Sequence, residues 1–279
     1  MVRDLPSRLW MDLTTEDFAT RDMSGVVAVL PVAAVEQHGP HLPLSVDARI
    51  GSGVLDAALA ILDDDAPVLV LPQLPVGKSD EHTAFAGTLT ISHQTLARVW
   101  FDIAESVHRT GCRRILFANS HGGQRALIDI VCRDIRVKLG MMAVNAAWFS
   151  MVRQDDLFGP TEAGHGIHGG AAETSLMLRL HPDLVRPSAI ANFPPVTIAW
   201  EDAGSTLTAE GAVGFGWQAQ DLHPSGACGD ARLATADAGG ILLDRSAAAL
   251  ARLIGELAAF PVERLQRSPG FPPGLGAAA

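Results

Sequence analysis

The sequence predicts an α/β fold in which helices cover a mostly parallel sheet. Four short, continuous apolar runs in the first half of the chain have the composition of strands buried on both faces. The stretches between them repeat apolar residues every three or four positions, which is typical of amphipathic helices. Strand-like and helix-like segments therefore alternate, and this order predicts a right-handed, doubly wound sheet.

The predicted strands are short and sharply bounded. They cover residues 26–30, 67–71, 113–118 and 141–144. Residues that interrupt regular structure flank them, such as Gly25 before the first strand and Pro72 after the second.

The predicted helices fall between and after these strands. They cover residues 47–62, 93–109, 124–139, 171–180 and 235–259. In the second helix Leu96, Trp100 and Ile103 recur at helical spacing, and Ser92 is expected to cap its first turn.

We expect a single domain over residues 1–262. Residues 184–230 combine Gly, Pro and scattered Trp, and are expected to form loops and short strands at the rim of the site. Residues 263–279 are rich in Pro and Gly and are predicted to be a flexible C-terminal tail.

Composition excludes several classes of protein. With 48% hydrophobic residues among 279, the chain can bury a substantial core. A net charge of −10 and the lack of a basic stripe argue against a nucleic-acid partner. No apolar run approaches the roughly 18 residues of a membrane span, and the first residues do not resemble a signal peptide. We expect a cytoplasmic protein whose Cys112, Cys132 and Cys228 are reduced and inert.

A cluster of ligand-type residues after the first strand is the most informative feature. The segment Glu36-Gln37-His38-Gly39-Pro40-His41 is followed by Asp47. Glu36 and His38 are two positions apart, so extended backbone turns both toward the same side. Asp47 lies too far along to share that face, but a turn through Gly39 and Pro40 can bring it back.

Similar clusters occur farther along the chain. Segments 77–82 and 119–123 follow the second and third strands, and segment 165–175 contains His168 and Glu173. In an open parallel sheet, ligands bind beyond the carboxyl ends of the strands. We therefore expect these clusters to meet at one edge.

Each candidate also has a structural explanation. A single residue such as His38 or His121 is more often a hydrogen-bonded loop histidine, and Glu173 would also be favoured at a helix N-terminus. His165 and His223 remain undecided. The positions of the candidate pocket residues Trp148, Phe149, Trp200, Phe215 and Trp217 do not follow from the sequence, and core packing is the alternative role.

The combined ligand set favours a metal centre. Its members offer nitrogen and oxygen donors: Glu36, His38, Asp47, His121 and Glu173. Five such ligands exceed what one zinc ion with an open position needs, and they suit two divalent ions bridged by a carboxylate, for which Asp47 is the candidate. Because no Cys takes part, Zn²⁺ and Mn²⁺ both fit.

These motifs resemble those of the creatininase (creatinine amidohydrolase) family of metal-dependent hydrolases. The most specific match is segment 36–44 with Asp47, supported by segments 79–82, 119–123 and 173–175. The resemblance covers about residues 20–255 and implies a three-layer α/β/α sandwich, a binuclear metal centre and commonly a hexameric assembly.

The resemblance also assigns roles. It implies that Glu36 and His121 bind one ion, that His38 and Glu173 bind the other, and that Asp47 bridges them. His168 matches the position that contacts substrate and shuttles a proton. The substrate-binding candidates are Ser79, His82, Gly122 and Gly123. Creatininase itself has an aromatic residue and a glutamate where this chain has the two glycines, so creatinine is not carried over as the substrate.

We therefore expect a hydrolase that cleaves an amide C–N bond in a small cyclic or linear amide. In this hypothesis a metal-bound hydroxide attacks the carbonyl, an ion stabilises the oxyanion, and His168 protonates the leaving nitrogen. The alternatives are opening of a lactone at the same site, trimming of a precursor peptide, and a non-catalytic anion-binding module at Gly122-Gly123. We expect a homo-oligomer.

Overall fold

The computed structural model describes residues 5–211 and 213–266 and contains a four-stranded parallel sheet. The strands are β1 (Val27–Val32), β2 (Val68–Val70), β3 (Arg114–Asn119) and β4 (Met142–Ala147), in the order β2-β1-β3-β4. In the register of β1 and β3, Val32 lies beside Asn119, so both strands end at the same level. All four predicted strands are confirmed.

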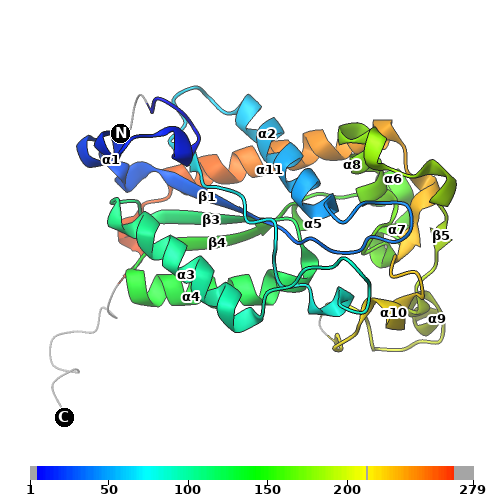
Figure 1. Cartoon of the computed structure of the whole chain (residues 1–279). Helices are drawn as coiled ribbons and strands as arrows, with labels where there is room; N and C mark the ends of the chain where they lie inside the picture. Colours follow the sequence, from blue (N-terminus) through cyan, green and yellow to red (C-terminus); the bar gives the residue numbers. More distant parts are fainter. Residues whose placement is uncertain (1–4, 212, 267–279) are drawn as a thin grey trace, which may run out of the picture.

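Helices cover both faces of the sheet. Their bounds are α2 (Val46–Ile61), α3 (His93–Arg109), α4 (Arg125–Leu139), α8 (Ala171–Leu180) and α11 (Ala236–Ala259). Figure 1 shows α3 and α4 on one face, with α2 and α11 on the other. The predicted three-layer α/β/α architecture is therefore present.

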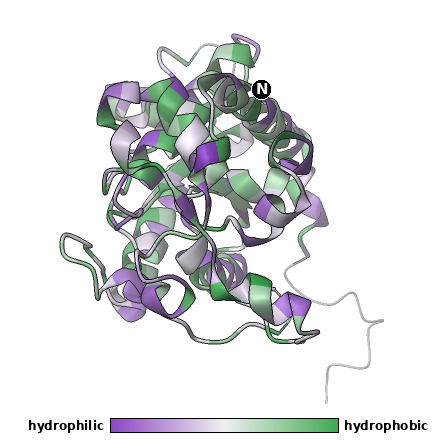
Figure 2. Cartoon of the chain, turned by 90° about the vertical axis from the view of Figure 1, so that its right-hand side faces the viewer, coloured by the Kyte–Doolittle hydropathy of each residue, from purple (hydrophilic) through white to green (hydrophobic). Residues whose placement is uncertain are grey.

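Side chains of alternate strand residues pack into two separate hydrophobic cores, one on each face of the sheet. Val27 and Val29 of β1 pack with α2, α8 and α11, whereas Ala28 and Leu30 pack with α3 and α4. This alternation follows from the pleat of a strand that is buried on both faces. Hydrophilic and hydrophobic residues share the same helices in Figure 2, as expected when one side of each helix faces a core.

Short elements gather at the end of the molecule opposite the C-terminal end of α11 (Figure 1). After β4 come α5 (Trp148–Met151), α6 (Asp155–Phe158) and α7 (Pro160–His165), which the sequence did not predict. Later in the chain lie β5 (Asn192–Phe193), α9 (Val196–Asp202), α10 (Ala219–Leu222) and β6 (Gly229–Asp230). The expectation of loops and short strands over residues 184–230 was thus wrong for α9 and α10. These two helices are too short to give a periodic signal in the sequence.

The remaining described elements lie mainly near the chain ends and in connections. They are α1 (Thr15–Thr20) and the short 3-10 helices at residues 10–12, 23–25, 80–82, 122–124, 182–184, 187–189, 231–233 and 262–264. Ser92 precedes α3 as predicted, but its hydroxyl contacts the Thr95 hydroxyl and caps no backbone amide. Most of the predicted tail, residues 267–279, lies outside the described residues. Within the described ranges, no helix is both long and apolar enough to cross a membrane.

The close packing of α11 on α8 can be tested with glycine substitutions in α11. A Cβ atom on Gly239 of α11 would lie 2.0 Å from the backbone oxygen of Ser175 in α8, whereas one on Gly255, later in the same helix, would meet no atom within 4 Å. We expect Gly239→Ala to lower the free energy of unfolding by about 1–3 kcal/mol through overpacking. Gly255→Ala should be neutral or add up to about 1 kcal/mol, because alanine favours helix. Urea unfolding of both variants measures the difference, and equal midpoints would contradict this account of the packing.

Candidate metal centre

Two loops at the carboxyl edge of the sheet carry the first ligands. Glu36 lies four residues after the end of β1, and His121 lies two residues after the end of β3. Ser120 donates its amide to the carbonyl of Val32 at 3.1 Å, which joins the two loops directly beyond the strands. Both ligand side chains are almost fully buried.

Two helix N-termini supply the other carboxylates. A left-handed turn at Gly39 (φ 70°) reverses the chain after His38, and Asp47 then lies in the first turn of α2. Glu173 lies in the first turn of α8, where its Oε2 accepts the amide of Gly169 at 2.6 Å. Both explanations offered for Glu173 therefore apply, because its other oxygen, Oε1, faces His38.

The carboxylate of Asp47 belongs to two sets of ligand atoms. Its Oδ2 lies 3.3 Å from Nδ1 of His121, which is also 3.2 Å from Oε1 of Glu36. Its Oδ1 lies 3.2 Å from Nε2 of His38, which is 3.7 Å from Oε1 of Glu173. Within each set the ligand atoms are all within 4.8 Å of one another. The structure thus brings all five predicted ligands together, with Asp47 shared.

Backbone carbonyls orient both imidazoles. Nδ1 of His38 lies 3.1 Å from the carbonyl of Glu36, and Nε2 of His121 lies 2.9 Å from the carbonyl of Lys78. A carbonyl accepts only from a protonated nitrogen, so the other nitrogen of each ring is the one turned toward the carboxylates. Metal-binding histidines are commonly held in this way.

The donor atoms fit divalent ions. Glu36 Oε2, His38 Nε2 and Asp47 Oδ2 are buried and make no hydrogen bond. Ligands about 2.0–2.2 Å from a tetrahedral zinc ion stand about 3.3–3.6 Å apart, close to the nitrogen–oxygen separations within both sets. Oxygen and imidazole donors without thiolate also suit manganese.

Neighbouring carboxylates strengthen proton binding by both His38 and His121. Burial alone would lower the pKa of His38, but the carboxylates of Glu173 and Asp47 outweigh it and raise that pKa well above its usual range. The carboxylates of Glu36, Asp47 and Glu81 act in the same way on the pKa of His121. Burial raises the pKa of Asp47, but the two histidines lower it further, so that the net shift is downward. The site therefore attracts positive charge.

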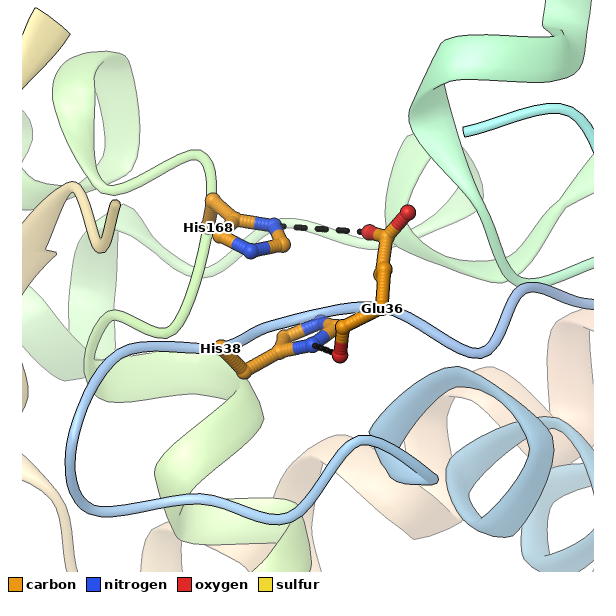
Figure 3. Close-up of side chains that lie close together, drawn as sticks. All are labelled: Glu36, His38 and His168. Atoms are coloured by element: carbon orange, nitrogen blue, oxygen red, sulfur yellow. Dashed lines mark hydrogen bonds and ion pairs between the residues drawn. The ribbon is translucent and has the colours of Figure 1, made fainter. Parts of the chain in front are cut away.

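A stack of imidazole rings lines the centre. The ring of His168 lies 4.0 Å from that of His38 and 4.2 Å from that of His82, measured between centroids. Nε2 of His168 donates to the backbone carbonyl of Gln37, and its Nδ1 points toward Oε1 of Glu36 at 3.7 Å (Figure 3). His168 therefore presents an unprotonated nitrogen to the ligand cluster, and burial lowers its pKa further.

The side chain of Gln37 organises this stack. Its Nε2 lies 2.7 Å from Nδ1 of His82 and donates to the carbonyl of Gly226 at 3.0 Å. His82 thereby turns Nε2 toward Glu36, 3.5 Å away. Gln37 was part of the sequence motif but received no role, because its contacts come from distant segments.

Glu81 is a second residue that the sequence analysis left without a role. Its Oε1 lies 3.3 Å from Nε2 of His121, on the side away from the ligand cluster, and its Oε2 binds Lys78 at 2.7 Å. A Cβ atom on Gly123 would lie 1.4 Å from Glu81 Oε1. The glycine thus makes room for a carboxylate that supports His121. The adjacent motif Ser79–His82 contained the signal, but only the fold shows which side chain points where.

A cavity of about 220 Å³ opens on the cluster. Its lining includes His82, His168, Gly122 and Gly123, but not Ser79, which is fully buried elsewhere. The aromatic lining residues are Trp148, Phe149 and Trp217, whereas Trp200 and Phe215 pack on each other. His165 binds Thr197 and Glu201, His223 binds Ser225, and neither lines the cavity.

The thiols lie away from this chemistry. Cys112 and Cys228 are buried, Cys132 is half-buried, and all three are free. Burial raises the pKa of both Cys132 and Cys228 to about 12. They are therefore unreactive, as expected.

Comparison with known proteins gives consistent matches. The family model Creatininase (creatinine amidohydrolase) matches residues 11–254. Creatinine amidohydrolase of Pseudomonas putida is 31% identical over 203 residues, covering 67% of this chain and 76% of that protein. The mycofactocin precursor peptide peptidase of Mycobacterium tuberculosis (strain ATCC 25618 / H37Rv) is 33% identical over 164 residues, covering 57% of this chain and 60% of the peptidase, less than two thirds of its length.

Solved structures share the fold. A crystal structure of creatinine amidohydrolase superposes with a TM-score of 0.71 at 26% identity, covering 91% of this chain and 99% of that chain. A structure described as "Creatininase Mn" gives 0.71 at 27% identity, covering 90% and 98%. A mutant creatininase described as "Zn-Zn type" gives 0.69 at 26% identity, covering 90% and 98%.

The shared carboxylate leads to a specific pattern of metal loss. We expect two divalent ions per chain in the wild-type protein, about one after His38→Ala or His121→Ala, and neither tightly held after Asp47→Ala, because Asp47 is common to the Glu36–Asp47–His121 and His38–Asp47–Glu173 groups. Elemental analysis after dialysis measures the content. His93→Ala, on the exposed start of α3, is the control. Wild-type metal content in Asp47→Ala would rule out the shared ligand.

The room beside Gly123 gives a second prediction. Gly123→Ala would displace the Glu81 carboxylate from His121, and we expect metal affinity to fall about 10- to 100-fold, as when other supporting contacts of metal ligands are lost. Gly122→Ala is the matched control for metal affinity, since its nearest new contact is an ordinary 3.6 Å to Glu210. Titration with a competing chelator measures both, and equal affinities would remove the role given to Glu81.

Proposed function

The chain belongs to the creatininase family, and we propose that it is a hydrolase that uses two divalent ions to cleave an amide C–N bond in a small cyclic or linear amide. The observation that carries the proposal is the carboxylate of Asp47, which turns one oxygen toward each of two buried ligand sets. A carboxylate shared in this way is the usual bridge of a two-metal hydrolytic site.

The two ligand sets divide the work of holding the ions. Glu36, His121 and Asp47 would hold one ion, and His38, Glu173 and Asp47 the other. When bound, such ions polarise a carbonyl oxygen and lower the pKa of water, which is the chemistry that amide hydrolysis needs. Zinc or manganese is the proposed metal, because the donors are oxygen and imidazole.

His168 would move the proton. Its Nε2 is fixed by the carbonyl of Gln37, so Nδ1 is the free nitrogen and lies beside Glu36 at the floor of the cavity. Because burial and the neighbouring His38 lower its pKa, His168 is neutral near pH 7 and can accept a proton from water. The same nitrogen can then deliver the proton to the leaving amine, which is a poor leaving group unless protonated.

The cavity limits the substrate. Its aromatic lining of Trp148, Phe149 and Trp217 surrounds a space of about 220 Å³, which is suited to a small molecule or to one end of a longer one. Gly122 and Gly123 give no aromatic wall at those two positions, so creatinine itself is not the proposed substrate.

Trimming of a precursor peptide is the second candidate. The similarity to a mycofactocin precursor peptide peptidase favours it, and one end of a peptide can enter the same cavity. Lactone opening stays a third possibility on chemical grounds, because an ester carbonyl is attacked more easily than an amide.

A substrate panel tests the proposal. Purified protein loaded with zinc or manganese is assayed on a lactam, a hydantoin-like ring, a formamide, a lactone and a short peptide. We expect the highest kcat/KM on one of the non-peptide amides, with activity lost on chelation and restored by metal. Full activity in a metal-stripped sample would refute the metal-dependent mechanism, and a clear preference for the lactone or the peptide would favour the corresponding alternative.

His168 is tested separately. His168→Gln should lower kcat about 10²- to 10⁴-fold, the usual contribution of a general acid–base, while metal content stays at the wild-type level. His181→Ala, in a residue that does not line the cavity, is the matched histidine control. Unchanged kcat in His168→Gln would assign proton transfer to another group.

A further inference from the structure

One cation among the described residues that line the cavity is not used by the chemistry proposed above. Arg125, the first residue of α4, is the only Lys or Arg in that lining, and it comes four residues after His121. Its guanidinium lies over the ring of Phe149, 5.9 Å from the centroid, and Phe149 is also part of the lining. Arg125 thus lies in the same cavity as the ligand cluster.

No carboxylate of the described residues forms an ion pair with this guanidinium within 4 Å, and its side-chain contact is with the ring of Phe149. Helical spacing would make Asp129 its partner, one turn later, but the Oδ1 of Asp129 is held by the amide of Asn145 at 2.8 Å. Glu210, also in the lining, lies close enough to interact with Arg125 through space but forms no ion pair with it. The exposed edge of the guanidinium is therefore available.

The charge balance of the centre is compatible with an anion. The three carboxylates of the ligand sets belong to Glu36, Asp47 and Glu173, and two divalent ions would outweigh them. Glu81 is already paired with Lys78. Glu210 and Arg125 carry opposite charges that offset each other, so two bound ions would leave about one net positive charge for a negatively charged group to meet.

We propose that Arg125 binds a carboxylate of the substrate, so that the natural substrate is an anionic amide whose carboxylate lies near the bond that is cleaved. This inference rests on the hydrolase function proposed above and adds the substrate class. Arginine is suited to the task because its planar fork donates two parallel hydrogen bonds to a carboxylate while its face stacks on an aromatic ring. Phe149 supplies that ring.

The test uses two probes of nearly the same size and shape, one charged and one neutral. N-formylglycine carries a carboxylate, and N-formylglycinamide is its neutral counterpart. Their dissociation constants are measured by calorimetry on metal-loaded wild-type protein and on Arg125→Ala, Arg125→Lys and Arg133→Ala. Arg133 is the matched control because it is exposed on the same helix and does not line the cavity.

We expect wild-type protein to prefer the anionic probe, and Arg125→Ala to weaken binding of that probe about 10- to 100-fold, the usual range for a hydrogen bond to a charged group. Binding of the neutral probe should change less than about twofold, since it makes no ion pair. Arg125→Lys should recover part of the loss, and Arg133→Ala should behave as wild type.

Three results would overturn the inference. In the first, wild-type protein shows no preference for the anionic probe, which includes the case that neither probe binds measurably. In the second, Arg125→Ala weakens binding of both probes equally, which indicates a structural role. In the third, Arg133→Ala weakens binding of the anionic probe as much as Arg125→Ala does. Formate release from the same probes reports on hydrolysis separately. Intact Arg125-dependent binding without any hydrolysis of the substrate panel would therefore refute the hydrolase and leave the anion site standing.

Discussion

Everything at the carboxyl edge of the sheet depends on the burial of three carboxylates together. Glu36 and Asp47 are almost fully buried, Glu173 is partly so, and within the described parts of the chain no Lys or Arg forms an ion pair with any of them. Removing a carboxylate from water costs several kcal/mol unless a cation replaces the lost solvation. Among the described residues, imidazoles are the only ion-pair partners of these carboxylates, so the cluster is stable when protons or metal ions occupy the space between the ligands.

The fold meets this demand with simple devices. Parallel pairing of β1 with β3 brings two loops to the same level, and Asp47 and Glu173 lie in the first turns of α2 and α8, where the helix dipole favours negative charge. Behind the ligands, main-chain carbonyls and the side chains of Gln37 and Glu81 fix the imidazole rings. The precision of the centre therefore comes from rigid elements and from a second layer of polar contacts.

Much of this was predictable from the sequence, for identifiable reasons. Strands and long helices carry periodic signals, and ligand-type residues directly after strands must share an edge, so the sequence could predict that the five candidate ligands lie together, as they do in the structure. Contacts between distant loops carry no such signal. Nothing in the spacing of residues 79–82 shows that Glu81 supports His121 or that Ser79 does not line the cavity. In the sequence Arg125 is an ordinary helix residue, and only the structure shows that its guanidinium lies over the ring of Phe149. The role of each ligand, the homo-oligomer and the cytoplasmic location stay predictions.

The four separate segments that supply the ligands have a consequence for the life of the folded chain. Ions held by Glu36 and His38, Asp47, His121 and Glu173 would act as cross-links between the loop after β1, the start of α2, the loop after β3 and the start of α8. Ligands that bind only the folded state add stability by mass action, about 2.7 kcal/mol at a hundredfold excess over the dissociation constant. Metal supply in the cell would then set how long each molecule survives proteolysis as well as how fast it turns over.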